Sequence, residues 1–173
     1  MVLAVAVSLV IVSTVHAAPV LWTLTDVEFD DGAIGSGSFV YDADTNAYSA
    51  VSVGTAGGSL PAAVYGAVVF GGEFDAFMVS DPFADLTGQP ALQLLFQAPL
   101  TNSAGFVDLA SFDPFSSSFE ATCFDTTCFD ASIDRVVVTG GLIGTVVPLP
   151  GALILMLSAL GLMIPVGLRQ TPG

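Results

Sequence analysis

Two groups of side chains in this sequence have types and spacing that suit chemistry. The first is a cysteine pair, Cys123 and Cys128, the only cysteines in the chain. A small, even number of cysteines is typical of disulfides in exported proteins. The two are too far apart to bond along a straight strand, so a disulfide requires a turn at 125–127. Two thiolates supply only half of a tetrahedral zinc site, and we therefore predict the disulfide.

The second group is Asp42, Asp44 and Asn46, which alternate like the first three ligands of a Ca²⁺-binding EF-hand loop. The pattern then departs from such a loop, because Ala47 replaces the glycine and Val53 replaces the bidentate glutamate. Asp and Asn also favour turns, where their side chains bond to nearby backbone. We interpret the segment as a β-hairpin turn, with a partial Ca²⁺ site as the alternative.

Several kinds of chemistry are excluded by composition. The chain of 173 residues has sixteen acids, two bases, no lysine and a net charge of −14, which argues against nucleic acid as a partner. The only histidine, His16, lies in a segment that we expect to be removed. Without histidine or lysine, the mature chain can form no Ser-His-Asp triad, Cys-His pair or Schiff base. A carboxylate pair remains, but no two acids stand out by spacing. We predict that the protein is not an enzyme.

The N-terminal residues are typical of a leader for export. Val2–Val12 is an apolar run that only Ser8 interrupts, and small residues follow it, with Val15 and Ala17 at the −3 and −1 positions. We predict a secretory signal peptide over residues 1–17, cut after Ala17, with a cut after Ala18 as the second choice. A buried N-terminal strand or helix is the alternative.

The C-terminal part contains a second apolar segment, Ala152–Leu168, without a charged residue. As a helix it would span about 26 Å, close to the ~30 Å hydrocarbon core of a bilayer. Arg169 follows directly and would mark the cytoplasmic end, which leaves the acidic body outside. We expect a transmembrane helix with Arg169 as its stop; a buried core helix is the alternative.

The residues before this segment carry a resemblance to a known class of signals. They are Val147, Pro148, Leu149, Pro150 and Gly151. With the apolar segment and the terminal Arg, they resemble the VPLPA variant of the PEP-CTERM sorting signals, in which the fifth residue is usually Ala. The resemblance implies recognition by an exosortase, a membrane-embedded enzyme of Gram-negative bacteria that would cut near the prolines.

Prolines spaced by one residue favour an extended backbone, which a protease active site requires. An ordinary proline-rich linker is the alternative interpretation of this motif.

Between the two ends, residues 18–145 contain all sixteen acids and Arg135 as the only base. Val, Phe, Thr and Tyr are plentiful, and no apolar stripe has the period of a helix, so we expect strands. An irregularity is expected near Thr25 and Asp26, where the apolar alternation changes parity, and another at Gly66. The expected strands are Val20–Phe29, Ser36–Tyr41, Ala47–Val53, Ala63–Phe70, Phe74–Val79, Ala91–Phe96, Phe106–Ala110, Ser117–Phe124 and Arg135–Thr139. Their number and spacing predict an antiparallel β-sandwich or jelly roll.

Phenylalanines are dense in this body. We expect most to pack in the core, with an aromatic binding surface as the alternative. The set comprises Phe70, Phe74, Phe77, Phe83, Phe106, Phe112, Phe115 and Phe119.

These observations divide the chain into a signal peptide (1–17), an acidic β-domain (18–145) and a sorting signal (146–173). We expect an exported, non-enzymatic protein of the cell envelope or extracellular matrix, held transiently in the inner membrane and processed by an exosortase-type enzyme. The alternative is a cell-surface module that binds polysaccharide or Ca²⁺. A permanently anchored single-pass protein is a third interpretation.

Overall fold

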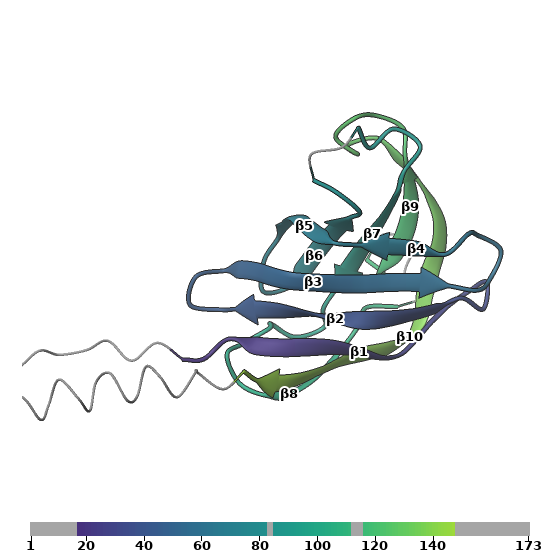
Figure 1. The fold of residues 1–173 in the computed structure, drawn as a ribbon. Helices are drawn as coiled ribbons and strands as arrows, with labels where there is room; N and C mark the ends of the chain where they lie inside the picture. Colours follow the sequence, from purple (N-terminus) through teal and green to yellow (C-terminus); the bar gives the residue numbers. More distant parts are fainter. Residues whose placement is uncertain (1–16, 83–84, 112–115, 148–173) are drawn as a thin grey trace, which may run out of the picture.

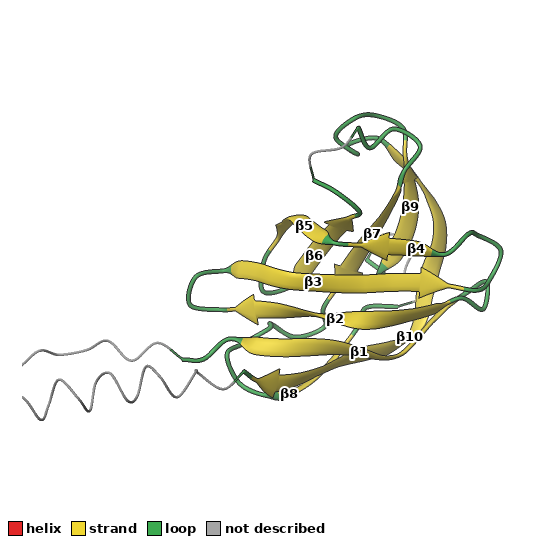
Figure 2. Cartoon of the chain, viewed as in Figure 1, coloured by secondary structure: helices red, strands yellow, loops and turns green. Residues whose placement is uncertain are grey.

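The computed structural model describes residues 17–82, 85–111 and 116–147. Within these ranges the chain forms β-strands and no helix, as Figures 1 and 2 show. The strands are β1 (Val20–Phe29), β2 (Ile34–Asp42), β3 (Ala47–Ala56), β4 (Ala63–Tyr65), β5 (Ala67–Gly71), β6 (Asp75–Val79), β7 (Pro90–Leu95), β8 (Gly105–Asp108), β9 (Phe119–Cys123) and β10 (Ala131–Val146).

The described segments therefore include no helix that could cross a membrane. The predicted transmembrane segment Ala152–Leu168, its stop Arg169 and signal-peptide residues 1–16 lie outside the described residues.

All strands join one antiparallel sheet in the order β4-β3-β2-β1-β10-β9-β7-β6-β5, with β8 beside β10. The long strand β10 pairs with β9 along its first part and with β1 along its second, so it carries the sheet from one half to the other. The edge strands β4 and β5 are joined by Gly66 alone; β4 approaches β6 and β7, and β5 approaches β3. The sheet is therefore nearly closed, and its two halves enclose one main core.

The all-β antiparallel prediction is confirmed, and the strand order adds how the strands are connected. Most neighbours in the sheet follow one another in the chain, as in a meander, whereas a jelly roll requires crossing connections. Gly66 divides the expected strand Ala63–Phe70 into β4 and β5, as anticipated for a crossing point. The irregularity near Asp26 is also present: the register with β10 shifts between Thr25 and Glu28, and Asp26 has a φ of 51°.

The prediction for the last strand was wrong in length. Arg135–Thr139 is only the middle of β10, which continues through Gly140, Gly141 and Gly144 to Val146. Glycines argue against a strand on propensity, but here close packing requires them. Gly140 has a φ of 121°, and a Cβ at Gly144 would collide with the ring of Trp22.

The core follows the inward positions of the strands. On β1, Val20, Trp22 and Leu24 alternate inward, and Trp22 is 1% exposed. A smaller cluster surrounds the two cysteines. Burying each large apolar side chain contributes roughly 1.5–3 kcal/mol.

The expectation for the phenylalanines was only partly right. Phe77 is buried, but Phe70, Phe74 and Phe106 are about half exposed, and the Phe70 and Phe77 rings stack with centroids 4.6 Å apart. These three lie on or beside short strands near the sheet edges, which have fewer neighbours to cover them. Phe119 is partly buried, whereas Phe83, Phe112 and Phe115 lie outside the described residues.

Candidate functional site

The predicted disulfide is present. Cys123 ends β9 and is bonded to Cys128, with their Cα atoms 4.7 Å apart. The chain turns at Asp125, whose carboxylate accepts hydrogen bonds from the backbone of Thr127, Phe129 and Asp130 and from the Thr127 hydroxyl. These bonds, the Thr127 hydroxyl first, lower the pKa of Asp125 to about 2, because they stabilise its charged form. The loop therefore has a covalent closure and a hydrogen-bonded centre.

The acidic segment 42–46 forms the predicted hairpin turn between β2 and β3. Tyr41 and Tyr48 face each other across the hairpin with ring centroids 4.7 Å apart, and Asn46 has a φ of 52°. The Tyr41 hydroxyl donates to the Asn46 side-chain oxygen at 2.7 Å. Asn46 is thus a turn residue whose amide oxygen already accepts a hydrogen bond.

The oxygens of Asp42 and Asp44 also accept hydrogen bonds. Asp42 accepts from the Asn102 amide, the Thr45 hydroxyl and the Asp44 backbone, and these bonds, Asn102 first, lower its pKa below the usual range. Asp44 accepts from the backbone of Ala17. A Ca²⁺ ion here would have to displace these donors, and the partial Ca²⁺ site stays the alternative to a simple turn.

The described part of the chain ends at Val147, the first residue of the predicted sorting motif. Val20 pairs with Val146, and the Val147 backbone donates to the Pro19 carbonyl at 3.0 Å. In Figure 1 the two described ends lie side by side, far from the disulfide loop. The rest of the motif, Pro148, Leu149, Pro150 and Gly151, and the stop Arg169 lie outside the described residues.

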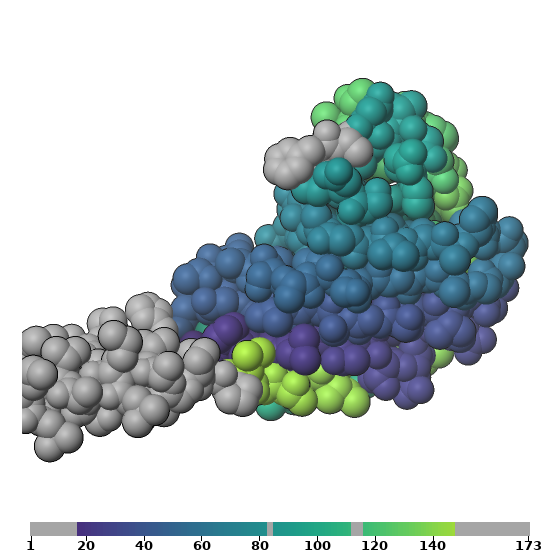
Figure 3. Space-filling view, viewed as in Figure 1, coloured from purple at the N-terminus to yellow at the C-terminus, as the bar shows by residue number. Residues whose placement is uncertain are grey.

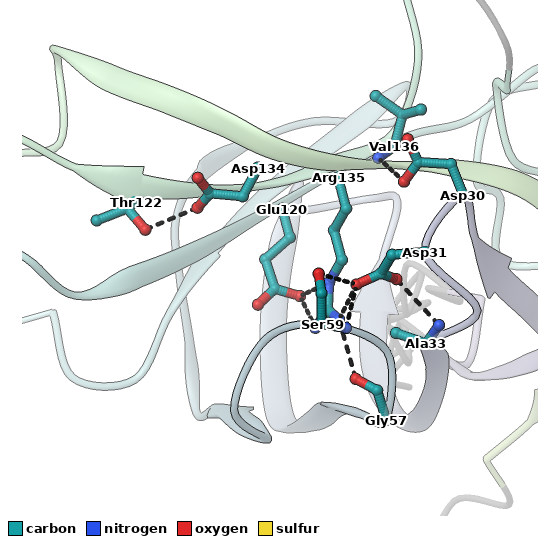
Figure 4. A network of polar contacts seen from close by, with 10 residues as sticks. All are labelled: Asp30, Asp31, Ala33, Gly57, Ser59, Glu120, Thr122, Asp134, Arg135 and Val136. Carbon is teal, nitrogen blue, oxygen red and sulfur yellow. Dashed lines mark hydrogen bonds and ion pairs between the residues drawn. The ribbon is translucent and has the colours of Figure 1, made fainter.

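A buried ion network (Figure 4) lies beside the end of β1 where Phe29 pairs with Val137, away from the end where Val20 pairs with Val146. The Arg135 side chain is 0% exposed. Its Nε and one terminal nitrogen donate to Glu120 at 3.1 and 2.8 Å, and the other terminal nitrogen donates to Asp31 at 3.2 Å and to the Gly57 carbonyl at 3.3 Å. The guanidinium also lies 4.9 Å from the centre of the Phe29 ring. Arg135 therefore ties together both halves of the sheet.

Asp31 accepts several hydrogen bonds besides the one from Arg135. Burial raises its pKa, but hydrogen bonds from the Ser59 backbone and hydroxyl, the Ala33 backbone and Arg135 outweigh that effect and hold the pKa well below its usual range. Two carboxylates thus face one guanidinium, which leaves the network with a net negative charge.

A β-bulge gives Arg135 its inward direction. Ile133 pairs with Ala121 and Arg135 with Glu120, so Asp134 is an extra residue in β10. Asp134 consequently points along the surface, where it accepts from the Thr122 hydroxyl at 2.7 Å (Figure 4).

This network was not predicted from the sequence. The partners of Arg135 are 15 and 104 residues away, and no local spacing joins them. One signal was available: Arg135 is the only base of the body and opens an apolar strand, so a buried position needed a carboxylate partner.

A cleft of about 400 Å³ lies beside the network, between β4 with its preceding loop and the ends of β6, β7 and β9. In Figure 3 the surface steps inward between the teal and green atoms at the top of the molecule and the blue atoms below them. One wall is apolar and comprises Leu60, Pro61, Ala62, Ala63 and Val64. The facing wall carries Ser80, Gln89, Glu120, Thr122 and Asp134. The cleft thus combines an apolar wall with a polar one, as small-molecule sites do.

Two buried hydroxyls lie near the cleft. Those of Thr55 and Tyr65 are buried and make no hydrogen bond of regular geometry within the described residues. Burial, and then the charge of the nearby Glu120, raise the pKa of Tyr65. The Tyr65 hydroxyl therefore lies within reach of the Thr55 and Glu120 side chains, beside the ion network.

Comparison with known proteins gives no further identification, because no family model, curated protein or solved structure matches this chain.

Proposed function

We propose that this protein is exported and then sorted to the cell envelope or extracellular matrix by an exosortase-type enzyme, without enzymatic activity of its own. In this proposal residues 1–17 are a signal peptide, and Ala152–Leu168 is a membrane helix that holds the chain until the enzyme cuts near Pro148 and Pro150.

One observation carries the proposal. Every strand of the described residues lies between the two predicted processing sites: β1 begins at Val20, the third residue after the predicted cut, and β10 ends at Val146, before Pro148 and Pro150. A chain cut at both sites would therefore keep every strand that the described residues form. The disulfide adds support, since such bonds persist in oxidising compartments outside the cytoplasm.

The two ends of the fold also leave on the same side, where β1 pairs with the end of β10. Both processing sites then lie near the membrane surface while the rest of the domain extends away from it. This arrangement is compatible with export of the domain first and removal of the C-terminal tail afterwards.

The test is the intact mass of the protein, isolated separately from envelope and medium of a Gram-negative host that encodes an exosortase. We expect a species that begins near Ala18 and ends near Pro150, with both cysteines oxidised. The matched control is the double variant Pro148→Ala/Pro150→Ala, which should retain the tail in the membrane fraction. A wild-type chain that keeps Gly151–Gly173 in this host would reject the sorting proposal.

A further inference from the structure

The apolar wall of the cleft beside Arg135 is anchored at both of its ends. At one end the Gly66 backbone donates to the Val79 carbonyl at 3.0 Å, directly after the wall formed by Leu60–Val64. At the other end, directly before that wall, Asp31 accepts from Ser59 while Arg135 donates to Gly57. These bonds fix the position of the Leu60–Val64 wall relative to β6 and to the ion network.

The charge around the cleft selects against anions. Glu120 and Asp134 both line it. Arg135 is the only Arg or Lys in the described part of the chain, and it points into the ion network with no exposed side-chain area. A phosphate or a uronic acid would therefore meet carboxylates and no available cation, whereas an amine would be attracted.

The lining matches a ligand that is rich in hydroxyls. Gln89 supplies a donor and an acceptor, Ser80 and Thr122 supply hydroxyls, and Asp134 supplies acceptors. The opposite wall of Pro61, Val64 and their neighbours offers apolar contact. A sugar ring presents this combination, with hydroxyls at its edge and C–H groups on its faces.

We propose that the cleft binds the terminal unit of a glycan that carries a free amine, such as a glucosamine-type sugar. In this site Asp134 pairs with the ammonium group, Gln89 and Thr122 bond the ring hydroxyls, and the wall of Leu60–Val64 packs against the ring. The site lies at the end of the domain away from the chain termini, so it faces outward when the tail is in the membrane.

The experiment is calorimetric titration of the full chain in mild detergent with three probes: a glucosamine hexamer, an N-acetylglucosamine hexamer and a galacturonate hexamer. We expect the glucosamine hexamer to bind at least tenfold more tightly than the acetylated one, and the galacturonate hexamer to give no heat. Equal affinity for the first two, preference for the uronate, or no heat with any probe would overturn the proposal.

The variant Asp134→Asn should weaken binding of the glucosamine hexamer about tenfold, because it removes a charged partner of the amine. Asp134 is exposed, so the fold should survive the change. The matched control is Asp130→Asn, which removes the same charge outside the cleft lining and should leave affinity within twofold. An Asp134→Asn protein that binds like its control would reject the assignment. Titration measures binding alone, so its result is independent of whether the tail is processed.

Discussion

The two ends of the domain are held by different kinds of interaction. At the bridged end, which comprises Asp31, Gly57–Ser59, Glu120, Cys123–Cys128 and Arg135, an ion network and a disulfide connect distant segments. At the terminal end, which comprises Ala17–Val20, Asp42–Asn46, Asn102 and Thr145–Val147, backbone pairing and exposed or half-buried hydrogen bonds hold the chain.

This difference shows how the fold can tolerate processing at one end. Removal of a flanking segment at the terminal end costs few interactions, because the strands there are already paired with each other. The bridged end keeps its geometry independently, since its ties do not involve the chain termini. We therefore expect perturbations at the two ends to differ in size and to act separately.

The largest effect is expected from Arg135→Met. It leaves Glu120, which is 1% exposed, as an uncompensated buried charge, a loss that typically costs 3–5 kcal/mol. Urea unfolding of the full chain in detergent, followed by the fluorescence of the buried Trp22, would measure it. The double variant Glu120→Gln/Arg135→Met removes both charges and should recover at least half of the loss. A single variant as stable as the wild type would show that the network does not hold the bridged end.

The disulfide should contribute less. Closing a loop this short stabilises a protein by about 2 kcal/mol in the chain-entropy model. The double variant Cys123→Ser/Cys128→Ser should therefore lower the free energy of unfolding by about that amount. Amide exchange at Val20 and Val146, at the terminal end, should quicken only in proportion to the loss of global stability. Selective opening of those two amides would contradict the separation of the ends.

Acid should weaken the bridged end through Asp31. Its pKa is lower in the folded than in the unfolded chain, so its contribution is present above the unfolded value near 4 and is lost as pH falls toward the folded pKa. We expect the urea midpoint to fall between pH 5 and pH 2.5, and Asp31→Asn to flatten that slope. The matched control at the terminal end is Asp42→Asn, whose pKa is lowered less far. If Asp42→Asn flattens the slope as much as Asp31→Asn does, the acid response belongs to both ends alike.

The sequence predicts what depends on local pattern and misses what depends on distant contact. Alternation and turn residues located β1 within its observed bounds, the Asp42–Asn46 turn, the bend at Asp26 and the crossing at Gly66. The length of β10 was missed, because its glycines are required by packing against Val27, Phe106 and Trp22. The ion network and the cleft were missed for a related reason: they form only when the sheet bends and brings Asp31, Glu120 and Arg135 together.

The smallest effect is expected from Asn102→Ala at the terminal end. The Asn102 side chain donates to Asp42 and accepts from the backbone of Ala43, and a half-exposed pair of hydrogen bonds contributes about 1 kcal/mol. The variant should also raise the pKa of Asp42 toward its usual value, because Asn102 is the main cause of its lowering. Carboxyl chemical shifts followed against pH would measure this change directly.

Combining Asn102→Ala with Arg135→Met tests the separation of the two ends most directly. Changes at distant sites without shared partners add within about 0.5 kcal/mol, and no hydrogen bond or ion pair among the described residues links Asn102 to the Arg135 network. The double variant should therefore lose the sum of the two single losses. A coupling energy above 1 kcal/mol would mean that the sheet transmits strain along β2 and β3 between the ends. In that case removal of the tail would change the geometry of the cleft, and the processed and unprocessed proteins would differ in their affinity for the glycan.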